Sequence, residues 1–199
     1  MRCELIAGHP DFRALSSITG IAVDLRYATD DNFVGRNLYG ALNCAWLHRE
    51  AATALERTVG WLHTNQPNLK LAVLDALRPH RVQIELWDFL EGTALRQYLA
   101  DPARGSIHSF GMAVDVTLLD ANGAELDMGT PFDALSILSH PQHEAEHLQQ
   151  GLLSEQQLAN RHVLYQAMQH GGFVGIASEW WHFDYGDRVR VRQSFTRIE

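Results

Sequence analysis

Segments with the periodicity of a helix and segments with the pattern of a strand alternate along this sequence. Ile21–Ala28 alternates apolar and polar residues, as a half-buried strand does. Apolar residues then recur every three or four positions from Ala45 to His63, and a second helical pattern starts at Pro79. Leu69–Leu74 between them is typical of a buried strand, and Ala113–Leu119 is rich in residues that favour strands. Interleaved helices and strands of this kind predict an α+β fold.

The second half of the chain predicts strands joined by tight turns. Asp120–Gly123 is a turn sequence that leads from Ala113–Leu119 toward Glu125–Met128, as in a hairpin. Ser154 and Gln157 have the spacing of a capping box, which predicts the start of a helix. Three β-rich pieces follow that helix: Phe173–Ile176, Trp181–Tyr185 and Val189–Phe195. We therefore expect a mostly antiparallel central sheet with flanking helices.

Length and charge limit the domain count and the partners. The chain has 199 residues, 46% of them hydrophobic, which suits one domain spanning residues 1–199. Its formal net charge of -8 argues against binding to nucleic acid or to an anionic membrane surface, because both are negatively charged. No stretch approaches the roughly 20 apolar residues that cross a bilayer.

The expected location is the cytoplasm. The first residues, MRCELIAGHPDF, contain too short an apolar stretch for a secretion signal and no cleavage site of small residues. Cys3 and Cys44 form neither a disulfide framework nor a zinc-finger spacing, which suits a reducing compartment. The sequence carries no indication of an oligomeric state.

Two short segments concentrate side chains that bind metals. They are residues 106–115, SIHSFGMAVD, and residues 179–182, EWWH, and together they supply two imidazoles and two carboxylates. A catalytic zinc site usually has three protein ligands and one position for water. We therefore predict one divalent ion per chain, held by His108, Asp115 and His182, with Glu179 as the spare carboxylate.

The positions of these residues support that prediction. Asp115 lies inside the β-rich run AVDVTLL, where a buried charge is costly unless it binds a cation. Gly111 permits a sharp loop, so that His108 and Asp115 can approach one ion. Glu179 and His182 are three residues apart and would face opposite sides of a regular strand, so we expect a bend at Glu179.

Arg78 is the candidate electrophile. It follows the predicted strand Leu69–Leu74 and precedes Pro79, which fixes the turn. A guanidinium at this place can donate hydrogen bonds to a substrate carbonyl or to the oxyanion formed on hydrolysis. A salt bridge with Asp75 is the structural alternative.

Each of these patterns also has a purely structural explanation on its own. A histidine before a glycine and an aspartate is often a surface or capping residue, and a Trp-Trp-His run is often core packing. The joint occurrence favours the metal site. A further group, His140, His143 and His147, has many acidic and amide neighbours and is expected to be a solvated segment without a second metal.

With these motifs the chain resembles the zinc D-alanyl-D-alanine dipeptidases of the vancomycin-resistance type. The family pattern S-x-H-x-x-G-x-A-x-D is present at residues 106–115, and E-x-W-H at residues 179–182. D-x-x-R-P is present at residues 75–79, and residues 27–35 are similar to the Y-A-T-x-D-N-F-x-G stretch of the dipeptidases. The wider zinc D,D-peptidase fold group also contains the hedgehog signalling domain.

The resemblance implies a function and roles for the residues. It implies hydrolysis of D-alanyl-D-alanine to two D-alanines, in which Glu179 deprotonates a zinc-bound water and the metal and Arg78 stabilise the oxyanion. It also implies that Ser106 and Asp133 hold the free amino group of the substrate, although Asp133 also suits the start of a helix. The ligand set would accept other divalent ions, such as Co²⁺.

Departures from the family pattern leave alternatives open. Phe110 stands where the dipeptidases commonly have Arg, Met112 where they have Ser or Thr, and Leu77 where Tyr is usual. These residues are expected beside the site, so they bear on the second residue of the dipeptide. A D,D-carboxypeptidase or peptidoglycan endopeptidase of the same fold and a non-catalytic zinc-binding interaction module remain alternatives, but the module would need neither Glu179 nor Arg78. Glycopeptide resistance and D-alanine recovery are both compatible roles.

Overall fold

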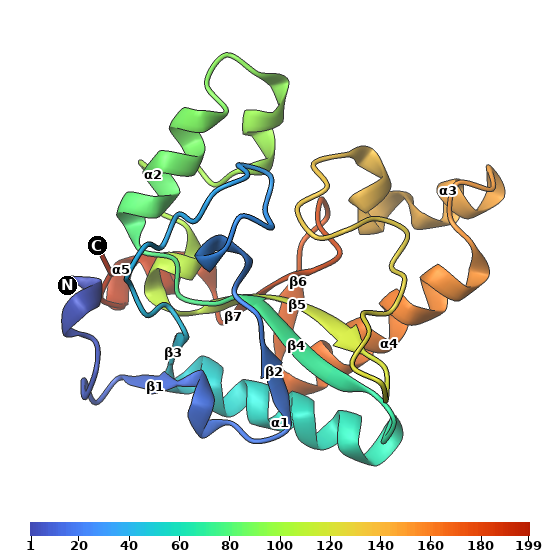
Figure 1. The fold of residues 1–199 in the computed structure, drawn as a ribbon, viewed down its shortest axis with the longest axis horizontal. Coiled ribbons are helices and arrows are strands. Elements are labelled where there is room, and N and C mark those ends of the chain that lie inside the picture. The colour runs from blue at the N-terminus through green and yellow to red at the C-terminus, as the bar shows by residue number, and fades with distance from the viewer.

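A five-stranded mixed sheet forms the centre of the computed structural model, which describes residues 1–199 (Figure 1). Its strand order is β2-β4-β5-β7-β6, and only the β2–β4 pair is parallel. The strands are β2 (Ile21–Val23), β4 (Lys70–Asp75), β5 (Ala113–Leu119), β6 (Phe173–Gly175) and β7 (His182–Tyr185). The α+β class and the mostly antiparallel sheet are thereby confirmed.

Two long helices pack together against this sheet. They are α1 (Arg49–Asn65) and α4 (Glu155–Gly171), which run along the lower part of Figure 1. A Cβ atom on Gly171 would lie 2.1 Å from Thr58 Oγ1 and 2.8 Å from the Ala54 carbonyl oxygen, so only glycine allows the helices to approach this closely. The larger apolar core lies between these helices and the sheet.

The sequence signals of α4 have the predicted structural effect. Ser154 accepts a hydrogen bond from the Gln157 amide, and the Gln157 side chain accepts one from the Ser154 amide. This reciprocal cap satisfies two amide groups that the first turn of a helix leaves free. Gly172, with φ of 94°, ends the helix in the left-handed conformation.

The remaining elements surround this core. β1 (Phe12–Ala14) and β3 (Trp46–His48) form a small antiparallel pair, so the helix predicted from Ala45 begins only at Arg49. α2 (His80–Phe89) lies at the top left of Figure 1, and α3 (Glu144–Gln149) and α5 (Arg188–Ser194) are short. Single 3-10 turns occupy Cys3–Leu5, Leu15–Ser17, Arg26–Ala28, Ala94–Tyr98, Ile107–Phe110, Ile137–Ser139 and Pro141–His143.

The prediction of a β-rich piece at Val189–Phe195 is wrong, because this segment forms most of α5. Val189 and Val191 alternate with arginines, which imitates a strand. Asp187 accepts a hydrogen bond from the amide of Arg190 and so caps the start of a helix. In the helix, Arg188 and Arg192 lie four residues apart on one face, and Arg190 points elsewhere.

Other predicted elements are shorter than expected. The strand predicted at Ile21–Ala28 ends at Val23 and continues into a 3-10 turn. The turn after β5 forms, since the Asp120 amide donates to the Ala124 carbonyl, but only a single bridge from Leu119 to Glu125 follows it. None of the helices is long and apolar enough to cross a membrane.

The segment around the second histidine group is less solvated than expected. Glu144 and His147 are buried, with 8% and 4% of their surface exposed. The Glu144 carboxylate accepts hydrogen bonds from Arg161 Nη1 at 3.0 Å and from the Tyr165 hydroxyl at 2.7 Å. These partners lie on α4, far along the chain, so the local sequence did not predict the burial.

Candidate functional site

Three neighbouring strands place acidic and imidazole side chains in a row across the sheet. Asp115 on β5 lies opposite His182 on β7 and, on its other side, opposite Asp75 on β4. Asp75 and Asp115 are almost completely buried. The row lies at the ends of β4 and β7, where the chain leaves or enters the sheet.

His108 reaches the same place from a short turn. It lies in the 3-10 turn Ile107–Phe110, which Gly111 ends with a φ of 65°. A Cβ atom on Gly111 would lie 2.7 Å from the amide nitrogen of His48. Glycine is therefore needed both for the left-handed backbone and for the close approach of the β3–α1 junction.

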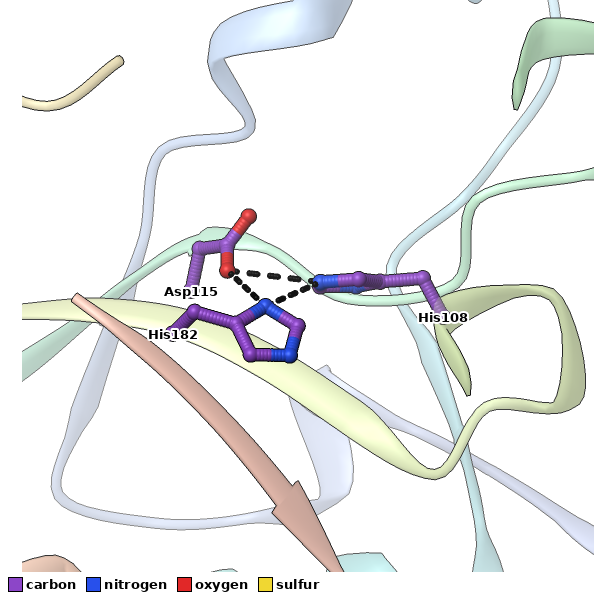
Figure 2. Close-up of side chains that lie close together, drawn as sticks. All are labelled: His108, Asp115 and His182. Atoms are coloured by element: carbon purple, nitrogen blue, oxygen red, sulfur yellow. Dashed lines mark hydrogen bonds and ion pairs between the residues drawn. The ribbon is translucent and has the colours of Figure 1, made fainter. Parts of the chain in front are cut away.

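The structure brings together the three residues predicted to bind a metal (Figure 2). His108 Nε2 lies 3.1 Å from His182 Nδ1 and 3.3 Å from Asp115 Oδ1, and His182 Nδ1 lies 2.9 Å from Asp115 Oδ1. Three ligands bound tetrahedrally to zinc at the usual distances lie about 3.3 to 3.6 Å apart. The observed triangle is only slightly smaller, so these residues fit a single small divalent ion.

The remaining nitrogen of each ring has a hydrogen-bond acceptor. His108 Nδ1 lies 2.7 Å from the carbonyl oxygen of Ala76, and His182 Nε2 lies 2.9 Å from Asp184 Oδ1. In the neutral rings these nitrogens carry the proton and donate to the acceptors. The lone pairs of His108 Nε2 and His182 Nδ1 therefore point toward each other, as ligands of one ion require.

The carboxylates around His182 control its charge. Burial disfavours the imidazolium, but Asp184 and Asp115 raise the pKa of His182 well above its ordinary value. Asp115 is buried too, yet His108 and His182 hold its pKa well below the usual range. A divalent cation bound by these three side chains would favour the neutral imidazoles and the ionised carboxylate.

Glu179 lies in the irregular segment before β7, as the predicted bend requires. It lines the cavity that contains the His108, Asp115 and His182 side chains. It also borders a second, mainly apolar hollow that contains Phe173, Trp180 and Phe183. Burial raises the pKa of Glu179 to about 7, an effect that His182 partly offsets and Asp115 strengthens. A carboxyl group with this pKa can take up and release a proton near neutral pH.

Arg78 is buried, lines the cavity and is held by several acceptors. Its Nε donates to Asp75 Oδ2 at 2.8 Å, and its Nη1 donates to Gln83 Oε1 at 3.1 Å. Its Nη2 donates to Asp115 Oδ2 at 3.2 Å, on the carboxylate oxygen that does not face the histidines. Arg78 thus forms the salt bridge with Asp75 that was the structural alternative, and it also lines the cavity.

The two residues implied to hold a substrate amino group also line the cavity. Ser106 is buried directly before the turn that carries His108. Asp133 has a φ of 60°, and its Oδ1 accepts a hydrogen bond from the Tyr27 hydroxyl at 3.1 Å. Its Oδ2 is buried without a partner, and burial together with the nearby Asp115 raises the pKa of Asp133 well above its usual value. Asp133 does not begin a helix.

The cavity measures about 230 Å³ and contains all seven predicted site residues. This is smaller than the roughly 300 to 1,000 Å³ of sites for drug-sized ligands, so it suits a small molecule. Leu77, Phe110 and Met112 do not line it; they are buried in the two apolar cores. They neighbour site residues along the chain but do not form the wall of the cavity.

Sequence reasoning missed three charged cavity residues: Asp184, Arg188 and Arg192. Asp184 follows His182 by two positions in a strand, so alternation alone puts both on one face. Arg188 binds Asp184 from α5. In the helix, Arg188 and Arg192 share one face and Arg190 does not. The prediction of a strand here therefore did not single out these two arginines for the cavity.

The sequence of this chain matches a known protein family over almost its whole length. The match is to Peptidase_M15, described as D-ala-D-ala dipeptidase, over residues 11–199. The chain belongs to this family. It is therefore a peptidase.

Curated members of the family are similar to the chain over most of its length. The D-alanyl-D-alanine dipeptidase of Escherichia coli K12 is 38% identical over 82% of this chain and 78% of its own length. That of Streptomyces coelicolor is 31% identical over 83% of this chain and 86% of its own length. The solved structure of the LdcB LD-carboxypeptidase has a TM-score of 0.42 at 15% identity over 93% of this chain and 72% of that chain, which is too distant to bear on function.

Proposed function

We propose that this chain is a zinc-dependent D-alanyl-D-alanine dipeptidase. The observation that carries the proposal is the triangle of His108 Nε2, Asp115 Oδ1 and His182 Nδ1, in which both rings have their other nitrogen hydrogen-bonded. Family membership supports hydrolysis of a dipeptide. His108, Asp115 and His182 would hold the ion, whose chemistry when bound is to polarise the scissile carbonyl and lower the pKa of water.

Glu179 is the proposed general base and acid. Its carboxylate accepts the proton of the attacking water and then delivers a proton to the nitrogen of the leaving D-alanine. The pKa of about 7 suits both steps, because the group is neither too weak a base nor too weak an acid at neutral pH.

Arg78 is the proposed electrostatic stabiliser of the oxyanion. It is buried at the cavity and stays charged because Asp75 and Asp115 offset the cost of its burial. Asp75 and Gln83 fix the guanidinium before the substrate arrives, so little reorganisation is needed as charge develops on the carbonyl oxygen.

Ser106 and Asp133 are the proposed contacts of the substrate ammonium. The unpartnered Asp133 Oδ2 is an acceptor that a charged amino group would satisfy. An ammonium beside it also favours the ionised carboxylate, which burial alone disfavours. A free amino terminus is then a requirement for binding, and the small volume of the cavity suits a dipeptide.

A D-alanine release assay tests the proposed function. The protein is given D-alanyl-D-alanine, its N-acetylated form and a peptidoglycan pentapeptide, each with and without a chelator, and its zinc content is measured. We expect cleavage of the free dipeptide alone, lost with chelator and restored by zinc. Cleavage of the pentapeptide would favour a carboxypeptidase, and zinc binding without any cleavage would favour an interaction module.

A further inference from the structure

The cavity contains three arginines, and their partners differ. Arg78 is paired with Asp75 and Asp115, and Arg188 is paired with Asp184. Arg192 also lines the cavity but lies within 4.0 Å of no carboxylate. Among the three arginines of the cavity, Arg192 is thus the one without a salt-bridge partner.

The surroundings of Arg192 hold its guanidinium in place but do not neutralise it. Its Nε donates to the carbonyl oxygen of Gly105 at 3.0 Å, directly before Ser106. No acceptor in the protein occupies its two Nη groups. Burial and the nearby guanidiniums of Arg104 and Arg188 lower the pKa of Arg192, and Asp184 offsets this effect only in part. Arg104, Arg188 and Arg192 thus lie close together on a chain of net charge -8, and a bound anion would reduce the repulsion between them.

The same cavity also contains two carboxyl groups without a salt-bridge partner. Asp133 and Glu179 form no salt bridge, so the cavity offers free carboxyl groups together with one free guanidinium. A dipeptide with free ends is a zwitterion that carries an ammonium and a carboxylate. Guanidinium groups bind carboxylates through paired N–H donors, which suits the two open Nη groups.

We infer that Arg192 binds the free α-carboxylate of the dipeptide and makes this enzyme selective for substrates with an unblocked carboxyl end. The inference rests on the proposed function and deepens it, since Arg192 becomes a specificity-determining residue for that reaction. Arg188 adds positive charge beside Arg192. It is paired with Asp184, the carboxylate that accepts the hydrogen bond of His182, and is therefore not free to bind the substrate.

The test compares D-alanyl-D-alanine with its C-terminal amide, in which a neutral group of similar size replaces the carboxylate. Wild type is expected to prefer the carboxylate. In Arg192→Gln, the KM for the dipeptide should rise about 10- to 100-fold, the scale of a lost charge-assisted hydrogen bond, with kcat nearly unchanged. Kinetics on the amide should stay as in wild type, and Arg192→Lys should recover part of the loss.

Arg190→Gln is the matched control. Arg190 lies on the same helix and is exposed near the Phe195 ring, but it does not line the cavity. Its replacement removes one positive charge from α5 and should leave both substrates unaffected. Equal losses on the dipeptide and the amide in Arg192→Gln, or an unchanged KM for the dipeptide, would overturn the inference.

Binding measurements separate this inference from the proposed function. Calorimetric titration of the dipeptide and the amide into Glu179→Gln, with and without Arg192→Gln, measures recognition without turnover. If wild type cleaves neither substrate, the proposed function fails, while the titration still decides whether Arg192 distinguishes carboxylate from amide. Inorganic phosphate serves as a further probe: if Arg192→Gln abolishes phosphate inhibition but not the preference for the dipeptide, Arg192 binds a separate anion and the inference is wrong.

Discussion

His182 Nε2 lies 2.9 Å from Asp184 Oδ1, two residues further along the same strand. This contact fixes the tautomer of the ring and turns Nδ1 toward Asp115. In Asp184→Asn the carboxylate that supports the ring is lost, so we expect metal affinity to fall about 10- to 100-fold. Competitive zinc titration measures the change. Asp88→Asn, on the exposed side of α2, is the control and should bind zinc as wild type does.

Turnover should decrease in acid because Glu179 must be ionised to accept a proton. Burial raises its pKa to about 7, so the active carboxylate form is lost as the pH falls through that region. A bound divalent cation stabilises the carboxylate and moves the midpoint to a lower pH. Measurement of kcat/KM against pH should therefore show an acidic limb with a midpoint at or below pH 7.

Replacement of the proposed base separates catalysis from metal binding. Glu179→Gln should reduce turnover by roughly 10² to 10⁴, the usual contribution of general acid-base catalysis. Its zinc content should remain that of wild type, because Glu179 is not one of the three clustered ligands. A Glu179→Gln protein with full zinc and full turnover would show that another group moves the proton.

Metal removal should lower the melting temperature as well as the activity. An ion that binds only the folded state at about 100 times its Kd contributes roughly 2.7 kcal/mol to the free energy of unfolding. For a chain of 199 residues this corresponds to a shift of about 5 to 10 °C. Differential scanning calorimetry with chelator and after zinc addition measures it. Identical melting curves would mean that no ion is bound in the native state.

Two glycines should respond oppositely to the same substitution. Gly111→Ala puts a Cβ atom 2.7 Å from the His48 amide at a φ of 65°, so we expect a loss of stability above about 1 kcal/mol and a displaced His108. Gly60→Ala, in the middle of α1 with no neighbour within 4 Å, should stabilise the protein by about 0.5 to 1 kcal/mol. Urea unfolding of both variants is the measurement.

Much of the fold followed from local sequence patterns. β5 was predicted residue for residue because its run is rich in residues that favour strands, such as Val114, Val116 and Thr117, and ends at a turn sequence. α4 was predicted from its capping box and its terminal glycines. α5 was mispredicted because it is short and starts with alternating arginine and valine. Such a segment fits the two-residue repeat of a strand as well as the repeat of a helix. Its helical state depends on the Asp187 cap and on the contact of Arg188 with Asp184.

The candidate site was also predicted only in part. His108, Asp115, His182 and Glu179 were found because motif and chemistry coincide in short segments, and the structure brings them to one cavity. The wall of that cavity could not be predicted, since it depends on how distant segments pack. Phe110 and Met112 turn into the core, while Arg192 reaches the cavity from the far end of the chain.

The row Asp75, Asp115 and His182 depends on the pairing of adjacent strands. Inserting or deleting one residue in β5 would turn the Asp115 side chain to the opposite face and separate it from its partners. Changes in chain length can therefore accumulate in the connections, such as the stretch between β5 and α4, but not within these strands. New substrate preferences are therefore expected to arise through loop changes and point substitutions that keep these three residues aligned across the sheet.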